Sequence, residues 1–191
     1  DCVTITPGQK LAGEPRDTVT FTNVEVAEVV PAAVTSDWVW NRAALVRAVL
    51  MVGALEKLLE LSVRYTGERV QFGQPLNRFQ AVQQQLALLA GEVAAARVAI
   101  EAAVLAAEQG EATAAIAAAK IRVGEAAGQA AAIAHQVHGA MGYTYEYPLH
   151  FLTKRLWAWR DEFGSESEWA RWLGHYIATR GAEALWPFLT A

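Results

Sequence analysis

Cysteine is almost missing from this chain of 191 residues, and its scarcity excludes several kinds of site. The single thiol, Cys2, cannot form a disulfide within the chain, and it cannot build a cysteine-ligated zinc site. Proteins without structural disulfides are typical of reducing compartments. We therefore expect a cytoplasmic location.

Long apolar runs and an excess of positive charge are also absent. Hydrophobic residues make up 53% of the chain, but polar residues interrupt them throughout. No stretch reaches the roughly 20 consecutive apolar residues that a membrane-spanning helix needs. With 16 basic against 20 acidic residues, the formal net charge of -4 argues against a nucleic-acid surface. The composition predicts a folded protein that binds neither a membrane nor a nucleic acid.

The N-terminal end resembles a piece of a larger sheet. Alternation of β-branched or apolar residues with polar ones predicts strands at 3–6 and 18–26. Two strands alone do not bury enough surface to be stable. Since the chain begins at Asp1 and not at an initiator Met, we expect a processed product or a fragment. We divide it into a β remnant, 1–34, and a helical domain, 35–191.

Helical spacing of apolar residues replaces the strand pattern in the second part of the chain. The first long helix is predicted to begin with Ser36 or Asp37 as its N-cap and to reach Gly67. Further helices are predicted at 79–109, 112–138, about 148–160, and 166–179. Short connections between long helices favour a mainly α fold, an up-down four-helix bundle with the short N-terminal β remnant.

No self-contained catalytic motif is present. The sequence has no Gly-rich phosphate loop after a strand, no His-Glu-x-x-His and no nucleophile elbow. His135 and His138 have no third ligand nearby, so a packing role is favoured over a metal site and we expect no metal. Four tryptophans near the C-terminal end are interpreted as core or interface anchors, with an aromatic ligand slot as the alternative: Trp157, Trp159, Trp169 and Trp172.

Two stretches are more specific than the rest. In 64–76 a helix ends near Arg69, and a turn containing Phe72 leads to the next helix. A capped helix-turn-helix would explain this pattern. In 136–148 a Gln is followed by Gly-Ala-Met-Gly, where small residues bring bare backbone to the surface. A helix end followed by a loop would explain this second pattern.

Together and in this order, these stretches resemble the C-terminal half of the acyl-CoA dehydrogenase family. The resemblance covers nearly the whole chain. It begins at 13–26, which is similar to the end of that family's middle β-domain. It continues through the Arg-x-Gln-Phe-Gly turn, Ala119-Lys120, the Gln-Val-His-Gly-Ala-Met-Gly-Tyr turn and Arg160-Asp161.

The resemblance implies a flavoenzyme that holds FAD at a subunit interface and oxidises acyl-CoA thioesters to trans-2-enoyl-CoA. Arg suits a pyrophosphate because its planar donors pair with phosphate oxygens, and Gly lets backbone N–H groups come close. Ala140 stands where the family usually has a second Gly, and Ser165 at a typical Thr position. The implied FAD contacts are Arg69, Gln71, Phe72, Gln80, Gln136, Gly139, Ala140 and Ser165.

The usual catalytic base is missing. Phe163 falls at the position of the family's catalytic Glu, and Ala43, followed by Ala44, falls where some members place it instead. Neither side chain can accept a proton. Three explanations are open: Glu162 serves from a rearranged turn, the chemistry is altered, or a partner subunit supplies the base.

We favour the partner subunit, because Arg155 to Gly164 resembles heteromeric acyl-CoA dehydrogenases of actinobacterial steroid side-chain breakdown. The chain would then complete an FAD site and the core of a homo- or hetero-oligomer with a related dehydrogenase subunit, and it would be inactive alone. Two alternatives are a non-catalytic helical scaffold and an acyl-CoA-binding module without redox activity.

Overall fold

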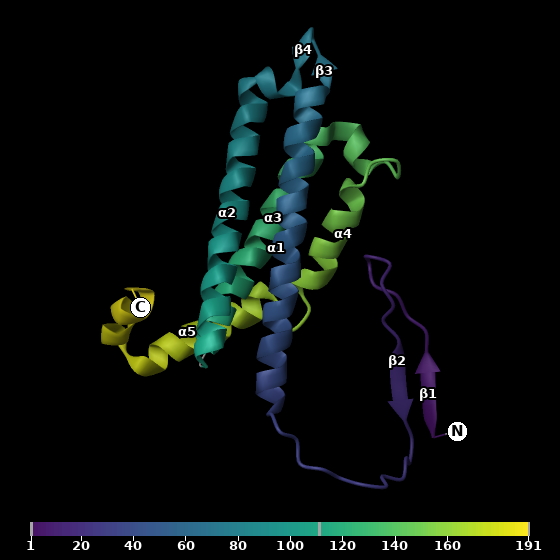
Figure 1. Cartoon of the computed structure of the whole chain (residues 1–191), viewed down its shortest axis with the longest axis vertical. Helices are drawn as coiled ribbons and strands as arrows, with labels where there is room; N and C mark the ends of the chain where they lie inside the picture. Colours follow the sequence, from purple (N-terminus) through teal and green to yellow (C-terminus); the bar gives the residue numbers. More distant parts are fainter. Residues whose placement is uncertain (1, 111, 191) are drawn as a thin grey trace.

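The computed structural model describes residues 2–110 and 112–190, which form a helical bundle with a β-hairpin beside it (Figure 1). Four helices make up the bundle: α1 (Ser36–Glu68), α2 (Gln80–Gln109), α3 (Thr113–His138) and α4 (Leu149–Arg160). α5 (Glu166–Arg180) crosses the lower end, and the short α6 (Leu185–Thr190) follows it away from the bundle. The mainly α fold is confirmed, with helix ends within one or two residues of the predicted ones.

Helix α3 lies at the centre and packs against α1, α2, α4 and α5. Half of its buried positions are alanine, interspersed with larger residues such as Ile116 and Val123. Alanine has the highest helix propensity, and its small side chain allows neighbouring helices to approach closely. The small residues of α3 therefore set the width of the bundle.

The N-terminus of α1 is capped one residue earlier than predicted. Thr35 has an extended backbone, and its side-chain oxygen accepts a hydrogen bond from Trp38 N at 3.1 Å. A side chain caps a helix from a non-helical residue, whereas Ser36 and Asp37 already lie within the first turn. Asp37 instead places a negative charge near the positive end of the helix dipole.

The hairpin contains β1 (Val3–Thr6) and β2 (Thr18–Phe21), paired antiparallel. The prediction of a strand reaching residue 26 was wrong. Asn23 adopts a positive φ of 49°, which interrupts an extended strand, and β1 offers no partner beyond Phe21. All residues of both strands are exposed. The hairpin meets the bundle through the loop that joins its strands.

Short elements connect the long helices at the upper end. β3 (Val70–Gln71) and β4 (Gln74–Pro75) form a tight hairpin, followed by the 3-10 turn η1 (Leu76–Arg78). Phe72 and Gly73, the two residues between the strands, both have positive φ, as a type I′ turn requires. Two further 3-10 turns are η2 (Gly139–Tyr143) and η3 (Ala182–Ala184). Within the described residues, no helix is long and apolar enough to cross a membrane.

We predict that Leu58→Ala in the buried face of α1 lowers the free energy of unfolding by about 2 to 5 kcal/mol, because it leaves a cavity. Leu58 is fully buried, whereas Leu50 on the same helix is 45% exposed. The matched variant Leu50→Ala should cost about 1 kcal/mol or less. Urea unfolding of both variants measures the difference. Equal losses would contradict the described burial of α1.

Candidate functional site

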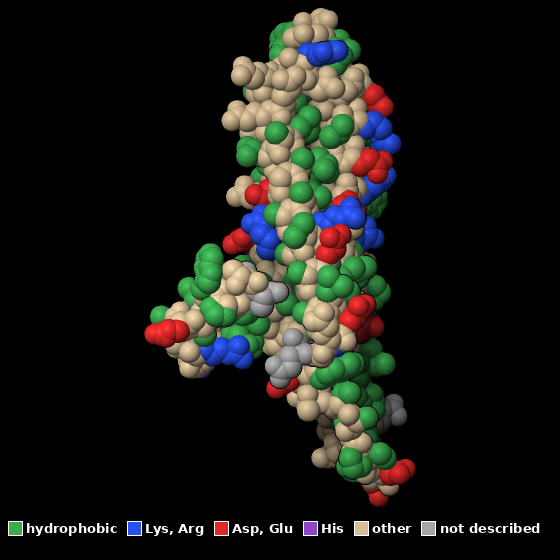
Figure 2. All heavy atoms as spheres, turned by 60° about the vertical axis from the view of Figure 1, so that its left-hand side comes forward, with side chains coloured by type: hydrophobic (Ala, Val, Ile, Leu, Met, Phe, Trp, Pro, Cys, Tyr) green, Lys and Arg blue, Asp and Glu red, His purple; other side chains and the backbone are tan. Residues whose placement is uncertain are grey.

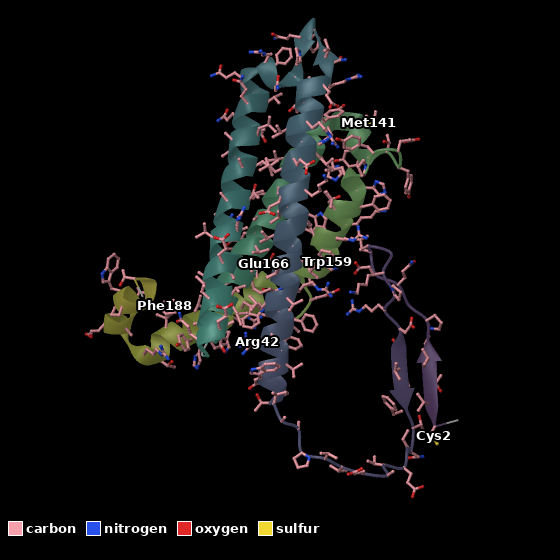
Figure 3. The ribbon with its side chains drawn as sticks, in the orientation of Figure 1. Cys2, Arg42, Met141, Trp159, Glu166 and Phe188 are labelled. Carbon is pink, nitrogen blue, oxygen red and sulfur yellow. The ribbon has the colours of Figure 1, made fainter. Side chains whose placement is uncertain are left out.

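A cavity of about 820 Å³ opens where the C-terminal ends of α1 and α3 meet the first turns of α2. It brings together two stretches that are far apart in sequence, and Figure 3 shows the labelled Met141 at this end. Five residues that the resemblance singled out line it: Arg69, Gln71, Gln136, Gly139 and Ala140.

Arg69 is positioned by the turn that ends α1. Its N–H donates to Tyr65 O at 2.8 Å, and its carbonyl accepts from Leu76 N at 2.9 Å. The backbone is therefore fixed on both sides. Within the described residues, no ion pair engages the Arg69 guanidinium, so the donors of this cation are available to a ligand in the cavity.

The opposite wall begins where α3 ends. Gly139 has a φ of 59° and donates its N–H to His135 O, and the chain then turns into η2. A Cβ added at Gly139 would meet no atom within 4 Å, so the backbone faces open space. Together with the exposed Ala140, it forms a wall that a ligand can approach closely.

Three other candidate residues do not line the cavity. Phe72 is 93% exposed at the tip of the β3–β4 turn, in edge contact with Phe79, and Gln80 is exposed at the start of α2. Ser165 lies at the N-terminus of α5, where its backbone N–H and hydroxyl both donate to the Glu168 carboxylate. The chain's own carboxylate therefore already occupies the donors of Ser165.

His138 also lines the cavity, although the sequence favoured a packing role for this residue. The ring is 3% exposed, stacks on Tyr65 and donates from Nδ1 to Ala134 O at 2.7 Å. Its Nε2 is buried and has no hydrogen-bond partner among the described residues. Burial lowers the pKa of His138, so the neutral ring presents an acceptor. In the sequence, only its place in the Gln-Val-His-Gly run could have indicated that His138 lies at this cavity.

At the lower end of the bundle, an aromatic and an aliphatic side chain occupy the two positions where the resemblance implies the catalytic Glu. Phe163 is half-buried and makes an edge contact with Trp40 at 5.6 Å between ring centroids. Ala43 is half-buried and Ala44 is fully buried in α1. A cavity of about 790 Å³ adjoins this end, lined by aromatic and charged residues that include Trp40, Arg47 and Glu162.

A buried lysine fixes the turn that carries Phe163. Lys120 is 2% exposed, and its Nζ donates to Arg160 O at 3.0 Å and to Glu162 O at 2.9 Å. Burial lowers the pKa of Lys120 to about 8. Phe163 has a φ of 56°, and its carbonyl accepts from Trp169 Nε1 at 2.9 Å. The turn is thus held from α3 and from α5.

Glu162 is engaged in two ion pairs. Its carboxylate lies 2.5 Å from Lys10 Nζ in the hairpin loop and 2.6 Å from Arg47 in α1, and its side chain is 14% exposed. Nearby, Glu14 of the same loop accepts from Trp159 Nε1 at 3.0 Å. We call Lys10, Arg47 and Glu162 the charge triad. The triad attaches the hairpin loop to the bundle, a structural use of the carboxylate.

The tryptophans divide between core and surface. Trp159 and Trp169 are 8% and 5% exposed and belong to the core, whereas Trp157 and Trp172 remain partly exposed. Figure 3 labels Trp159, which points from α4 toward the hairpin loop. Among the described residues, no group of three or more His, Cys, Asp or Glu side chains is arranged to hold a metal ion.

The fold defines a helical bundle with a cavity at its helix ends, lined in part by Arg69 and Gly139. The family model for the acyl-CoA dehydrogenase C-terminal domain matches residues 35–161. The chain therefore belongs to the acyl-CoA dehydrogenase family, and the resemblance found in its motifs is confirmed.

Individual relatives agree with this assignment. The acyl-CoA dehydrogenase IpdE2 of Mycolicibacterium smegmatis is 30% identical over 81% of this chain. Among solved structures, a variant of the Tcur3481–Tcur3483 steroid ACAD is 29% identical over 93% of this chain, with a TM-score of 0.85. The ChsE4–ChsE5 complex of Mycobacterium tuberculosis has the same fold, with 24% identity over 93% of this chain and a TM-score of 0.86. The chain spans 50% of IpdE2 and 49% of each of these two structures.

We predict that Glu162→Gln lowers the free energy of unfolding by about 1 to 3 kcal/mol, because Arg47 loses its ion-pair partner and Lys10 keeps only Glu14. The matched variant Glu60→Gln breaks an exposed pair with Lys57 and should leave the free energy of unfolding nearly unchanged, because water screens that pair. Urea unfolding at neutral pH measures both. Similar small losses would show that the charge triad does not hold the loop.

We predict that stability declines as the pH falls through about 6.5, the ordinary histidine value. Burial lowers the pKa of both His135 and His138, so the unfolded chain binds protons more readily than the folded one. Their contribution to the free energy of unfolding is present above that value and is lost below it. Urea unfolding at about pH 7.5 and 5.5 measures the decline. A decline of the same size in His138→Gln would exclude His138 as a contributor.

Proposed function

We propose that this chain is part of an FAD-dependent acyl-CoA dehydrogenase, in which it completes an FAD site while a related subunit supplies the catalytic base. One observation carries the proposal. The cavity gathers Arg69, Gln71, Gln136, Gly139 and Ala140, whereas the two positions for a base hold Phe163 and Ala43. The residues expected to contact the cofactor are thus present, whereas a carboxylate is missing from both positions expected for the base.

The cavity suits the anionic dinucleotide part of FAD. The Arg69 guanidinium would pair with phosphate oxygens, and the Gly139–Ala140 backbone would lie against the pyrophosphate. The volume of about 820 Å³ fits part of such a ligand. Phe72, projecting from the tip of the β3–β4 turn, would contact a ligand held mainly by a neighbouring subunit.

Oxidation of an acyl-CoA to the 2-enoyl-CoA removes a proton from Cα and a hydride from Cβ. Bound FAD supplies the acceptor for the hydride, and a carboxylate is required for the proton. In this chain Glu162 is committed to Lys10 and Arg47, so we assign the carboxylate to the partner. Phe163 and Trp40 would form an apolar wall instead.

The particular relatives support a heteromeric assembly. The steroid ACAD that is 29% identical to this chain is named after two proteins, Tcur3481 and Tcur3483. The proposal has four parts: an acyl-CoA substrate, bound FAD, a hetero-oligomer with a related subunit, and a cytoplasmic location. Residues 1–34 are proposed as the end of a middle β-domain and 35–191 as the C-terminal helical domain.

Co-purification of the native protein from its host tests the proposal. We expect a yellow complex of this protein with a related subunit, and acyl-CoA-dependent reduction of an artificial electron acceptor. The protein isolated from its partner should be inactive. Activity of the isolated protein that disappears in Glu162→Gln would assign the base to Glu162. A colourless complex without turnover would favour the alternative, a non-catalytic helical scaffold. The observation that supports this alternative is the absence of a carboxylate at residues 163 and 43.

We predict that Arg69→Ala weakens FAD binding by the complex about tenfold to one hundredfold, because a charge-assisted pair with phosphate is lost. Arg78→Ala is the matched control, since Arg78 is exposed in η1 and does not line the cavity. Flavin content after dialysis, read from the absorbance spectrum, measures both variants. Equal retention in the two variants would exclude Arg69 from the cofactor site.

A further inference from the structure

Three of the four histidines in the chain surround the short segment that joins α3 to α4 at the upper end of the bundle. The segment spans residues 139–147 and contains η2, and its first three residues line the cavity. Figure 3 labels one of them, Met141. We call residues 139–147 the wall segment. His135 and His138 contact it from α3, and His150 contacts it from α4.

His135 holds the middle of the wall segment. Its ring stacks on Tyr143 with 4.5 Å between the ring centroids, and its Nε2 lies 3.1 Å from Thr153 Oγ1 of α4. Gly142 is buried, and a Cβ added there would lie 3.1 Å from His135 Nδ1. An added side chain would crowd the ring, so the segment fits closely against His135.

His138 holds the end of the wall segment. Its ring is 3% exposed, stacks on Tyr65 of α1 and lies 4.9 Å from the ring of Tyr147, centroid to centroid. The hydroxyl of Tyr147 donates to Leu61 O at 3.4 Å. In agreement with this burial, Figure 2 shows no histidine at the upper end of the face that it draws. His138 therefore joins the last residue of the segment to α1.

Neither ring can take up a second proton without creating a buried donor that lacks an acceptor. The Nδ1 of His138 donates to Ala134 O at 2.7 Å, so its second nitrogen is Nε2. A neutral His135 that donates from Nε2 to Thr153 keeps Nδ1 as its second nitrogen. Both second nitrogens are buried and have no hydrogen-bond partner among the described residues. Each added proton would place an unpaired charge and an unpaired N–H in the protein interior.

The groups around the two rings do not compensate such a charge. Within the part of the chain that the structure describes, neither histidine forms an ion pair with a carboxylate. Glu146 is exposed, and Lys154 lies over Tyr145 instead. Burial lowers the pKa of both His135 and His138. The titratable and charged groups that α1, the wall segment and α4 bring near the two rings are Arg64, Tyr65, Glu68, Arg69, Tyr143, Tyr147 and His150.

We propose that His135 and His138 form a pH switch, in which protonation releases the wall segment from the bundle while the long helices stay folded. The helices are held by a separate apolar core, to which Leu58, Leu89 and Ile116 belong. Release of the segment would move Ala140 and Met141 away from the rest of the cavity. The release does not depend on any ligand, and only its effect on FAD rests on the proposed function.

The segment is held above about pH 6.5, the ordinary value for histidine, and is released as the pH falls below that value. The two rings have a lowered pKa while the segment is held, whereas rings exposed by its release return to the ordinary value. Each ring that binds its proton only after release makes the released state about tenfold more populated at pH 5.5 than at pH 7.5.

Hydrogen exchange of the full-length protein, purified with any subunit that accompanies it, tests the switch. After correction for the intrinsic effect of pH on amide exchange, peptides covering 139–153 should exchange about tenfold faster or more at pH 5.5 than at pH 7.5. Peptides covering 93–107, on the buried face of α2, should change less than about twofold. An unchanged rate in 139–153, or an equal increase in both regions, would overturn the proposal.

A substitution that removes one titrating ring gives the second measurement. His138→Phe keeps a ring against Tyr65 but cannot bind a proton, so it should reduce the response of 139–153 about tenfold. His175→Phe is the matched control, since His175 is exposed on α5 and lies outside the segment. Circular dichroism at pH 7.5 checks that both variants are folded. A full response in His138→Phe, or an equal reduction in His175→Phe, would contradict the switch.

The flavin content of the same complex separates the switch from the proposed function. We expect dialysis at pH 5.5 to remove more FAD than dialysis at pH 7.5, and His138→Phe to retain more of it at pH 5.5. Faster exchange of 139–153 without loss of FAD would support the switch and contradict the assignment of the cavity to FAD. Loss of FAD without faster exchange would contradict the switch and leave that assignment in place.

Discussion

The close packing of α3 among four other helices is the constraint on which the rest of the structure depends. Its alanines fill the centre of the bundle with little side-chain volume, so the neighbouring helices lie near its backbone. Because α3 is held along its whole length, both of its ends are fixed in space. The C-terminal end brings Gly139 to the upper cavity, and the N-terminal part brings Lys120 to the turn below α4.

The two ends of the bundle have become specialised in different ways. At the upper end, the guanidinium of Arg69, which has no ion-pair partner among the described residues, belongs to the wall of a cavity. At the lower end, the ionisable side chains of Lys120 and Glu162 are engaged in contacts within the chain. Lys120 donates to two backbone carbonyls, and Glu162 forms ion pairs with two cations. This contrast is the physical basis for assigning ligand binding to this chain and the proton-accepting group to another.

Much of the fold could be predicted from the sequence, because helical periodicity depends on local spacing. The second strand was overestimated, since alternation continues beyond the last residue that β1 can pair, Phe21. The gathering of Arg69 with Gln136 followed from a family resemblance, not from periodicity. The partners of Glu162 could not be predicted, because Lys10 and Arg47 come from distant segments whose approach depends on tertiary packing. The outward position of Phe72 depends on the turn geometry at the end of α1.

The charge triad also has a consequence for how this protein can vary among species. Loss of the carboxylate leaves Arg47 without an ion-pair partner and Lys10 with only Glu14, whereas loss of either cation leaves Glu162 paired with the other. Residue 162 is therefore expected to change together with residue 47, whereas residue 10 can change by itself. A homologue that restores a carboxylate at the position of Phe163 is under no such restriction, since that side chain belongs to no ion pair.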